Sequence, residues 1–454
     1  MTNTSDEFIK VNSAGKKSIN DYAVYQHVKE NQPICIIGGV PYLYTNGVYE
    51  RDETGARLKG IITACLAGYE DMITSYIQNR IYNLFMNDPD LHFDMDDMNN
   101  YPAEWVMFKN IIYDPVNKTF HAHDPEYRAL NMVNVDYPNE VYNTLKRKEF
   151  CRFEVYKWLC SLFPWVDDFE MVLEYLGYCL TIDTRQQKFL IIEGLPGSGK
   201  SLVIKAIGEV VGHKNVSSLA LEKISHRFAS YNLVGKLVNS CGDISTSAIE
   251  DITTIKQAIG EDYIQAEAKG KDAISFKPYA KLLFSSNGLP TIGNEQSAGF
   301  YRRVLVAKAS HNVTEIDPMF FDNVIKPELD FFVFMILKAL ERMYERGTIA
   351  ESDGSKAMVN EMWSNSDPVK AWLNDCTIRA VGERLSKPYA YTLFEQYRFH
   401  MQAPQISRNA FYASLKAKGY SFIKSNGCDY IQDLRITAVP ITQTPGTDAR
   451  RKQG

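Results

Sequence analysis

The residues best suited to chemistry lie together in the segment GLPGSGKS, residues 194–201. Its spacing fits the pattern G-x-x-x-x-G-K-[ST], in which glycines turn the backbone so that its N–H groups surround phosphates. Lys200 would reach the β- and γ-phosphates of a triphosphate, and the Ser201 hydroxyl would ligate Mg²⁺. We therefore predict ATP and Mg²⁺ as cofactors. The predicted nucleotide-binding residues are Gly194, Pro196, Gly197, Ser198, Gly199, Lys200 and Ser201.

Such a loop needs a strand before it and a helix after it, and the flanking residues predict both. Residues 189–192 form a short apolar run suited to a buried parallel strand. Residues 200–211 are amphipathic, and the polarity rises after Gly212. The helix would direct the positive end of its dipole at the phosphates. An ordinary glycine-rich loop is the alternative, and these flanking elements disfavour it.

Two further strand-like runs end in polar residues that could complete the site. Residues 236–242 lead to Asp243, and residues 281–286 lead to Asn287. Because ligands of open α/β sheets bind at the carboxyl ends of the strands, we expect Asp243 to join Ser201 in binding Mg²⁺. We expect the Asn287 amide to hold the attacking water without adding a charge. Lys200, Asp243 and Asn287 are therefore predicted catalytic residues.

Two adjacent arginines, Arg302 and Arg303, precede the apolar run 304–307. Arginines in this position are more often surface residues than catalysts. The functional alternative is an arginine finger, which stabilises the charge of a phosphoryl group during transfer.

A hairpin is expected over residues 264–276, with Gly270 at its tip between Lys269 and Lys271. The pattern alone fits a solvated turn. It also fits a finger that contacts the phosphates of DNA.

The charge is distributed unevenly along the 454 residues. The net charge is −5, yet residues 367–454 carry 13 Lys and Arg against 7 Asp and Glu, whereas residues 1–150 carry 14 against 21. Contact with nucleic acid is therefore expected to be local, through the basic C-terminal segment and a few lysines elsewhere.

Composition and patterning favour a cytoplasmic protein with no membrane segment. No apolar run approaches the ~18 residues of a membrane span, and the N-terminus MTNTSDEFIK lacks the apolar core of a signal peptide. The eight cysteines contain no C-x-x-C pair, which favours buried free thiols in a reducing compartment.

The remaining segments predict a multidomain α/β chain. Residues 42–49 and 110–121 have hairpin patterns, and residues 150–181 have helical spacing broken at Pro164. After residue 367, three helical stretches and an Asn-Gly hairpin fit a winged helix, a module that binds DNA or docks proteins. The predicted domains are an α+β domain (1–149), a helical collar (150–186), a P-loop ATPase domain (187–310), a helical connection (311–366), a winged helix (367–440) and a flexible basic tail (441–454). The predicted DNA-binding residues of the winged helix are Arg408, Lys416, Lys418 and Lys424.

The order of these motifs resembles the superfamily 3 helicases, and most closely their phage and plasmid primase-helicase group with a poxvirus-type helicase domain. The resemblance rests on the phosphate loop, the single acid at Asp243, the hairpin in IKQAIGEDYIQAEAKGKDAISFKP, and the runs KLLFSSNGLP and GFYRRVL. It covers about residues 100–310. It implies an AAA+-like P-loop fold for the central domain.

The resemblance also implies a ring, usually of six subunits, that threads single-stranded DNA. Arg302 or Arg303 would then be the finger in a neighbouring subunit's site, and Lys269 and Lys271 would line the central channel. Many relatives have two adjacent acids at the second motif, whereas Gly242 precedes Asp243 here. Glu193 is a weak alternative for polarising the attacking water.

These features lead to one principal functional hypothesis. The chain is expected to be an ATP-dependent helicase and replication initiator that assembles as a ring, binds single- and double-stranded DNA, and unwinds DNA at the origin of a phage, plasmid or genomic island in a bacterial host. The primase half of such proteins is expected to be absent, and host or element replication proteins are possible partners. The alternative is an initiator that binds the origin, uses ATP only to switch assembly, and recruits a host helicase.

Overall fold

A computed structural model describes residues 7–226, 228–245, 252–267, 273–292, 298–310, 317–400 and 405–437. The chain divides into two compact units. Unit 1 consists of Met1–Ser245, Asp251–Gly288 and Arg303–Ser355, and unit 2 of Thr246–Glu250, Leu289–Arg302 and Lys356–Gly454.

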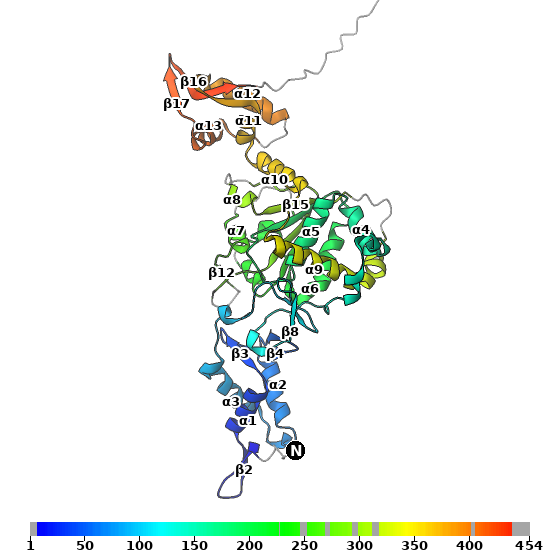
Figure 1. Ribbon diagram of the computed structural model, residues 1–454. Coiled ribbons are helices and arrows are strands. Elements are labelled where there is room, and N and C mark those ends of the chain that lie inside the picture. The colour runs from blue at the N-terminus through cyan, green and yellow to red at the C-terminus, as the bar shows by residue number, and fades with distance from the viewer. Residues whose placement is uncertain are drawn as a thin grey trace, which may run out of the picture. The chain divides into compact units, whose positions relative to one another are not determined.

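Unit 1 contains a five-stranded parallel sheet, of which Figure 1 labels β15 beside α5. Its strand order is β10-β11-β14-β9-β15, so that β9 lies between the two strands that come latest in the sequence. The strands are β9 (Phe189–Glu193), β10 (Val216–Ser217), β11 (Val238–Cys241), β14 (Lys281–Ser286) and β15 (Val304–Lys308). Their apolar runs suit a sheet that is covered on both faces.

Helices cover this sheet and share one hydrophobic core with it. They are α4 (Glu154–Leu162), α5 (Val166–Tyr178), α6 (Lys200–Val211) and α9 (Leu329–Arg346), with the π-turn Phe321–Ile325 preceding α9. Helix α7 (Thr253–Ile259) is a further helix of unit 1. The break between α4 and α5 falls at Pro164, as the sequence predicted. Helices α5 and α9 pack so closely at Gly177 that a Cβ atom there would lie only 2.3 Å from the carbonyl oxygen of Ile336. The predicted collar is therefore continuous with the core of the sheet.

The N-terminal part of unit 1 combines small antiparallel sheets with three helices. Its elements are β1 (Ile9–Val11), β2 (Lys17–Ile19), α1 (Asp21–Asn31), β3 (Ile34–Ile37), β4 (Val40–Thr45), β5 (Val48–Arg51), α2 (Ala56–Cys65), α3 (Ser75–Met86), β6 (Val106–Met107), β7 (Ile112–Asp114) and β8 (Thr119–His121). The two hairpins predicted here are present as β4–β5 and β7–β8. Asn46 and Gly47 connect β4 to β5 with φ angles of 50° and 95°.

A separate antiparallel hairpin, β12 (Ile264–Ala266) and β13 (Ile274–Phe276), lies in sequence between β11 and β14 of the parallel sheet. Its pairing matches the hairpin expected over residues 264–276. The tip, including Lys269 and Lys271, lies outside the described residues.

Unit 2 has its own core around Trp372, Phe394 and Phe411. Its elements are α8 (Ala298–Tyr301), α10 (Asp353–Ser366, which begins in unit 1), α11 (Pro368–Cys376), β16 (Thr377–Ser386), α12 (Lys387–His400), α13 (Arg408–Ala417), β17 (Phe422–Ser425) and β18 (Cys428–Ile436). The three helices and the hairpin β17–β18 were expected, whereas β16 was not. It pairs with β18 in a three-stranded sheet. Most of its side chains are exposed, so it lacks the apolar alternation that would have predicted a strand.

No helix in the described ranges is both long enough and apolar enough to cross a membrane.

Candidate functional site

The loop between β9 and α6 follows a path that depends on its glycines. Gly199 has a φ of 101°, a left-handed conformation that side chains disfavour, and α6 starts at the next residue. Gly194 begins the loop, where a Cβ atom would lie 2.5 Å from the carbonyl oxygen of Ala309. The conformation of one glycine and the close packing of the other fix the path of the loop.

Lys200 is the polar centre of this loop. Its side chain is 4% exposed, and Nζ donates to the carbonyl oxygens of Gly194 at 2.6 Å and Leu195 at 2.8 Å. Nζ also donates to Oδ1 of Asn287 at 3.1 Å. Burial lowers the pKa of Lys200, and the charges of Asp243 and Glu193 oppose that shift. The ammonium group is therefore held beside the cavity by neutral oxygens, and a charged acceptor could replace them.

Asp243 and Asn287 follow neighbouring parallel strands, β11 and β14, at the same edge of the sheet. The backbone N–H of Asp243 donates to Oγ of Ser285 at 3.3 Å, and that of Ile244 donates to the carbonyl oxygen of Ser285 at 3.0 Å. Asp243 itself has a φ of 51°, which aspartate tolerates better than most side chains. The sequence therefore placed both side chains at the correct edge, but missed the hydrogen bond from Lys200 to Asn287.

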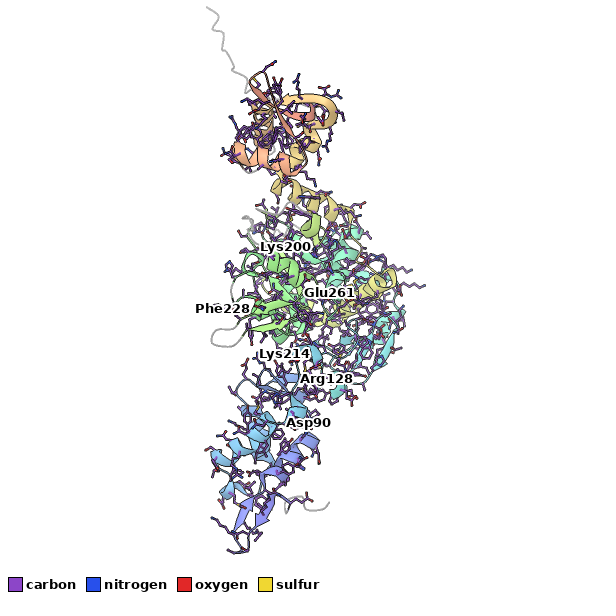
Figure 2. All side chains as sticks on the ribbon, turned by 90° about the vertical axis from the view of Figure 1, so that its left-hand side faces the viewer. Asp90, Arg128, Lys200, Lys214, Phe228 and Glu261 are labelled. Atoms are coloured by element: carbon purple, nitrogen blue, oxygen red, sulfur yellow. The ribbon has the colours of Figure 1, made fainter. Side chains whose placement is uncertain are left out.

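These residues line one cavity of about 520 Å³. Figure 2 labels Lys200 at the start of α6 and Lys214 beyond its end, where Lys214 pairs with Glu50 at 2.7 Å instead. The cavity is lined by Trp158, Pro196, Gly197, Ser198, Gly199, Lys200, Ser201, Leu202, Asp243, Asn287, Asp317, Pro318 and Phe320.

The oxygen groups of this cavity fit a small hard cation. The Ser201 hydroxyl and the Asp243 carboxylate line the same space, and Mg²⁺ prefers such oxygen ligands. Mg²⁺ is commonly bound through one or two protein ligands, with water and substrate phosphates completing its octahedron. The donor set is therefore suited to Mg²⁺ that arrives with a nucleotide.

Arg303 lies at the amino ends of the parallel strands, whereas the cavity lies at their carboxyl ends. Its carbonyl oxygen accepts a hydrogen bond from the N–H of Phe189 at 2.8 Å, which places it beside the first residue of β9. Its Nη2 donates to Oε1 of Gln187 at 3.4 Å. Arg302 is exposed and belongs to unit 2, so the chain passes between the units at this pair. The length of β9, about 16 Å, separates Arg303 from the cavity of its own chain.

The basic residues predicted to bind DNA in unit 2 fall into two kinds. Arg408, Lys416 and Lys424 are exposed on α13 and β17. Lys418, in contrast, pairs with Asp367 at 2.8 Å, and its Nζ donates to Oγ of Ser414 at 3.0 Å. Asp367 is 2% exposed at its side chain and accepts a hydrogen bond from the N–H of Lys370 at 3.0 Å at the start of α11. Lys418 therefore has a structural role in unit 2.

Comparison of the sequence with known proteins finds a family and a viral protein that are similar to parts of this chain. Residues 192–303 match a family of unknown function, DUF5906. A 144-residue segment is 29% identical to a protein of Acanthamoeba polyphaga mimivirus that is named as a helicase, L207/L206. The match covers 30% of this chain and 15% of the viral protein.

Comparison of the fold gives similarity over nearly the whole chain. The A form apo structure of the NrS-1 C-terminal region has a TM-score of 0.51 and 10% identity, covering 90% of this chain and 98% of that one. A second apo structure of the same region has a TM-score of 0.50, again at 10% identity, with coverages of 92% and 99%. The chain therefore has a mixed α/β fold with a parallel sheet like that of the NrS-1 C-terminal region. Its sequence similarity to a helicase-named protein is confined to one segment.

Proposed function

We propose that this chain is an ATP-dependent DNA helicase and replication initiator of the superfamily 3 type, acting for a phage, plasmid or genomic island. The observation that carries the proposal is the single cavity lined by Lys200, Ser201, Asp243 and Asn287. A cationic donor, two oxygen ligands for a metal and a neutral amide are the groups that phosphoryl transfer requires. The match to a helicase-named viral protein supports the same activity.

The residues of the cavity have separate roles in the proposed hydrolysis. Lys200 exchanges its carbonyl partners for the β- and γ-phosphates, since charged oxygens are stronger acceptors than neutral ones. Ser201 and Asp243 hold Mg²⁺, which when bound neutralises charge on the phosphates. When Lys200 donates to the phosphates instead of to Oδ1 of Asn287, the Asn287 amide becomes able to orient the attacking water.

The arginine pair acts in a neighbouring subunit. Arg303 lies at the amino edge of the sheet and cannot reach the cavity of its own chain, so a role in hydrolysis requires a second subunit. A guanidinium supplied in this way stabilises the transferring phosphoryl group and makes hydrolysis depend on assembly. We therefore propose a ring, with six subunits as the expected number.

DNA contact is divided between two regions in this proposal. Lys269 and Lys271, which lie between β12 and β13 in sequence, would grip single-stranded DNA in the channel. Unit 2 acts as a winged helix that contacts duplex phosphates through Arg408, Lys416 and Lys424, which are exposed on its surface. Both contacts are with phosphate, so neither specifies an origin sequence.

A strand-displacement assay tests the helicase directly. Purified protein should separate a forked duplex only when both ATP and Mg²⁺ are present. Protein that hydrolyses ATP and binds duplex DNA without separating it would overturn the helicase and support the alternative, an initiator whose ATP site switches assembly. Unit 2 favours this second function, because it packs around its own apolar core and carries exposed basic residues on its surface.

Mixed assemblies test the arginine pair. Lys200→Ala protein and protein carrying both Arg302→Ala and Arg303→Ala should each be inactive in ATP hydrolysis. Their mixture should regain part of the activity, because one interface can combine an intact loop with an intact arginine pair. A mixture that stays inactive would show that the finger is not shared between subunits.

A further inference from the structure

The cavity beside Lys200 has an apolar wall, which the binding of phosphates and a metal does not explain. Its apolar lining residues include Trp158, Leu202, Pro318 and Phe320, and none of them belongs to the strand ends that carry Asp243 and Asn287. A triphosphate and its metal need charged and polar contacts, so an apolar wall in the same cavity implies a flat apolar group attached to the phosphates.

Trp158 comes from α4 and lies directly against the glycine loop. Its side chain is 7% exposed, and Nε1 would lie 3.5 Å from a Cβ atom built on Gly199. The N–H edge of the indole therefore faces the first turn of α6, where the proposed phosphates bind. Because this nitrogen only donates hydrogen bonds, it suits an anionic neighbour.

Phe320 provides the second aromatic surface, from the segment that leads into the π-turn. Its ring centroid is 6.3 Å from that of Trp158, with an angle of 61° between the planes. The two rings already contact edge to face, so a flat ligand cannot insert between them. It must lie against one of their faces, on a wall that Pro318 extends.

A polar group stands at the rim of the same wall. Asp317 is exposed and lines the cavity, and its Oδ1 accepts a hydrogen bond from the N–H of Met319 at 2.8 Å. This bond fixes the carboxylate beside Pro318. A carboxylate accepts hydrogen bonds from the exocyclic amino groups of nucleobases.

We propose that Trp158, Pro318 and Phe320 form the binding surface for the nucleobase, and that Trp158 also donates its indole N–H to the phosphate chain. This inference rests on the proposed function, since it assigns the part of the same cavity that the phosphates leave open. Stacking on an aromatic face tolerates different bases. Purines should bind better than pyrimidines because they offer a larger flat surface, and uracil, which lacks an amino group for Asp317, should bind least well.

Competition between nucleotides and inorganic tripolyphosphate tests the base surface in the unaltered protein. Stacking of one base corresponds to roughly a 5- to 150-fold change in affinity. ATP should therefore bind at least about fivefold more tightly than tripolyphosphate, both with Mg²⁺, in isothermal titration calorimetry. Equal affinities would overturn the proposal.

Two conservative variants separate the roles of the rings. Phe320→Leu keeps an apolar side chain but removes the aromatic face, so the preference for ATP over tripolyphosphate should shrink. Trp158→Phe keeps a ring but removes the N–H donor, so the affinity for tripolyphosphate itself should fall as well. Unchanged ratios and affinities in both variants would overturn the assignment of these residues.

Trp165 provides the matched control, because it is another tryptophan of the same helical region and is 51% exposed. Trp165→Phe should leave both affinities unchanged. Nucleotide binding should change the intrinsic fluorescence of this variant, but the change should be lost in Trp158→Phe. A failure of the proposed function would look different, since neither ATP nor tripolyphosphate would then bind in a way that depends on Lys200.

Discussion

The cavity of unit 1 and the basic surface of unit 2 hold their charged residues in opposite ways. Lys200 is buried, and its ammonium group has defined partners at 2.6, 2.8 and 3.1 Å. Arg408, Lys416 and Lys424 are exposed on α13 and β17. Hydrolysis needs groups fixed in place before the substrate arrives, whereas contact with a DNA backbone needs mainly positive charge. The two regions should therefore respond differently to the same kind of substitution.

Substitution of Asp243 should have the largest effect. In Asp243→Asn, an amide replaces the carboxylate that we assign to Mg²⁺, and a neutral ligand binds a hard cation less well. We expect ATP turnover to fall by about 100-fold or more, while nucleotide binding persists through the loop. Steady-state hydrolysis over a range of Mg²⁺ concentrations measures this. Turnover close to that of the unaltered protein would move the metal ligand to another residue.

Replacing Lys269 and Lys271 together by alanine should separate hydrolysis from movement. Basal ATP hydrolysis should stay within about twofold, since we assign neither lysine to hydrolysis, but strand displacement should be lost because the channel no longer grips phosphates. Both activities are measured on the same preparation. Normal unwinding by this variant would mean that the hairpin is a solvated turn, and the switch-like initiator would become the better account.

Lys416 and Lys418, two residues apart, sharpen the contrast within unit 2. Lys418→Ala leaves the buried Asp367 carboxylate without its ion pair, which should lower the free energy of unfolding by roughly 1–3 kcal/mol. Lys416→Ala should change stability by less than about 0.5 kcal/mol but reduce the salt dependence of duplex binding by about one phosphate contact. Thermal unfolding and binding at several salt concentrations measure the two effects. Equal stabilities would remove the structural role of Lys418.

A smaller effect concerns Lys281, which is buried at the start of β14. Its Nζ donates to the carbonyl oxygens of Thr181 and Tyr279, both at 2.8 Å, and burial lowers its pKa to about 8. The unfolded chain, with a lysine pKa near 10.4, binds more protons than the folded chain above pH 8, so stability rises with pH.

The gain from Lys281 should amount to about 1 kcal/mol between pH 8 and 9. It is measured as the difference between the unaltered protein and Lys281→Met, because this subtraction removes the titration of cysteines and tyrosines. A difference that does not vary with pH over this interval would show that Lys281 titrates normally.

Local patterns predicted the parts of the site that depend on neighbours in sequence. The run 189–192, the glycines and Lys200 specify a strand, a loop and a helix within one segment, and the polar ends at Asp243 and Asn287 follow from parallel strands. Trp158 and Phe320 could not be predicted in this way. Each has the spacing of an ordinary core aromatic, and only the fold brings Trp158 of α4 and Phe320, which precedes the π-turn, to the same cavity.

The same limit applies to unit 2. Lys418 has the composition and position of a DNA contact at the end of α13, but its partner Asp367 begins α11 and comes close only through the fold. Strand β16 contains Gly382 and mostly exposed side chains, so it was recognisable only by its pairing with β18. The features of unit 2 that the sequence did not predict are contacts between residues far apart in the chain, more than local conformations.

The cavity around Lys200 should hydrolyse ATP, and a pair of lysines on α6 tests this most directly. Lys200→Ala removes the cation of the loop, whereas Lys205→Ala removes an exposed lysine of the same helix that lies over the ring of Phe321 at 3.8 Å. Circular dichroism should show that both variants are folded. We predict that Lys200→Ala hydrolyses ATP at least about 100-fold more slowly and that Lys205→Ala stays within about twofold of the unaltered protein. Hydrolysis by Lys200→Ala at the rate of Lys205→Ala would contradict the account.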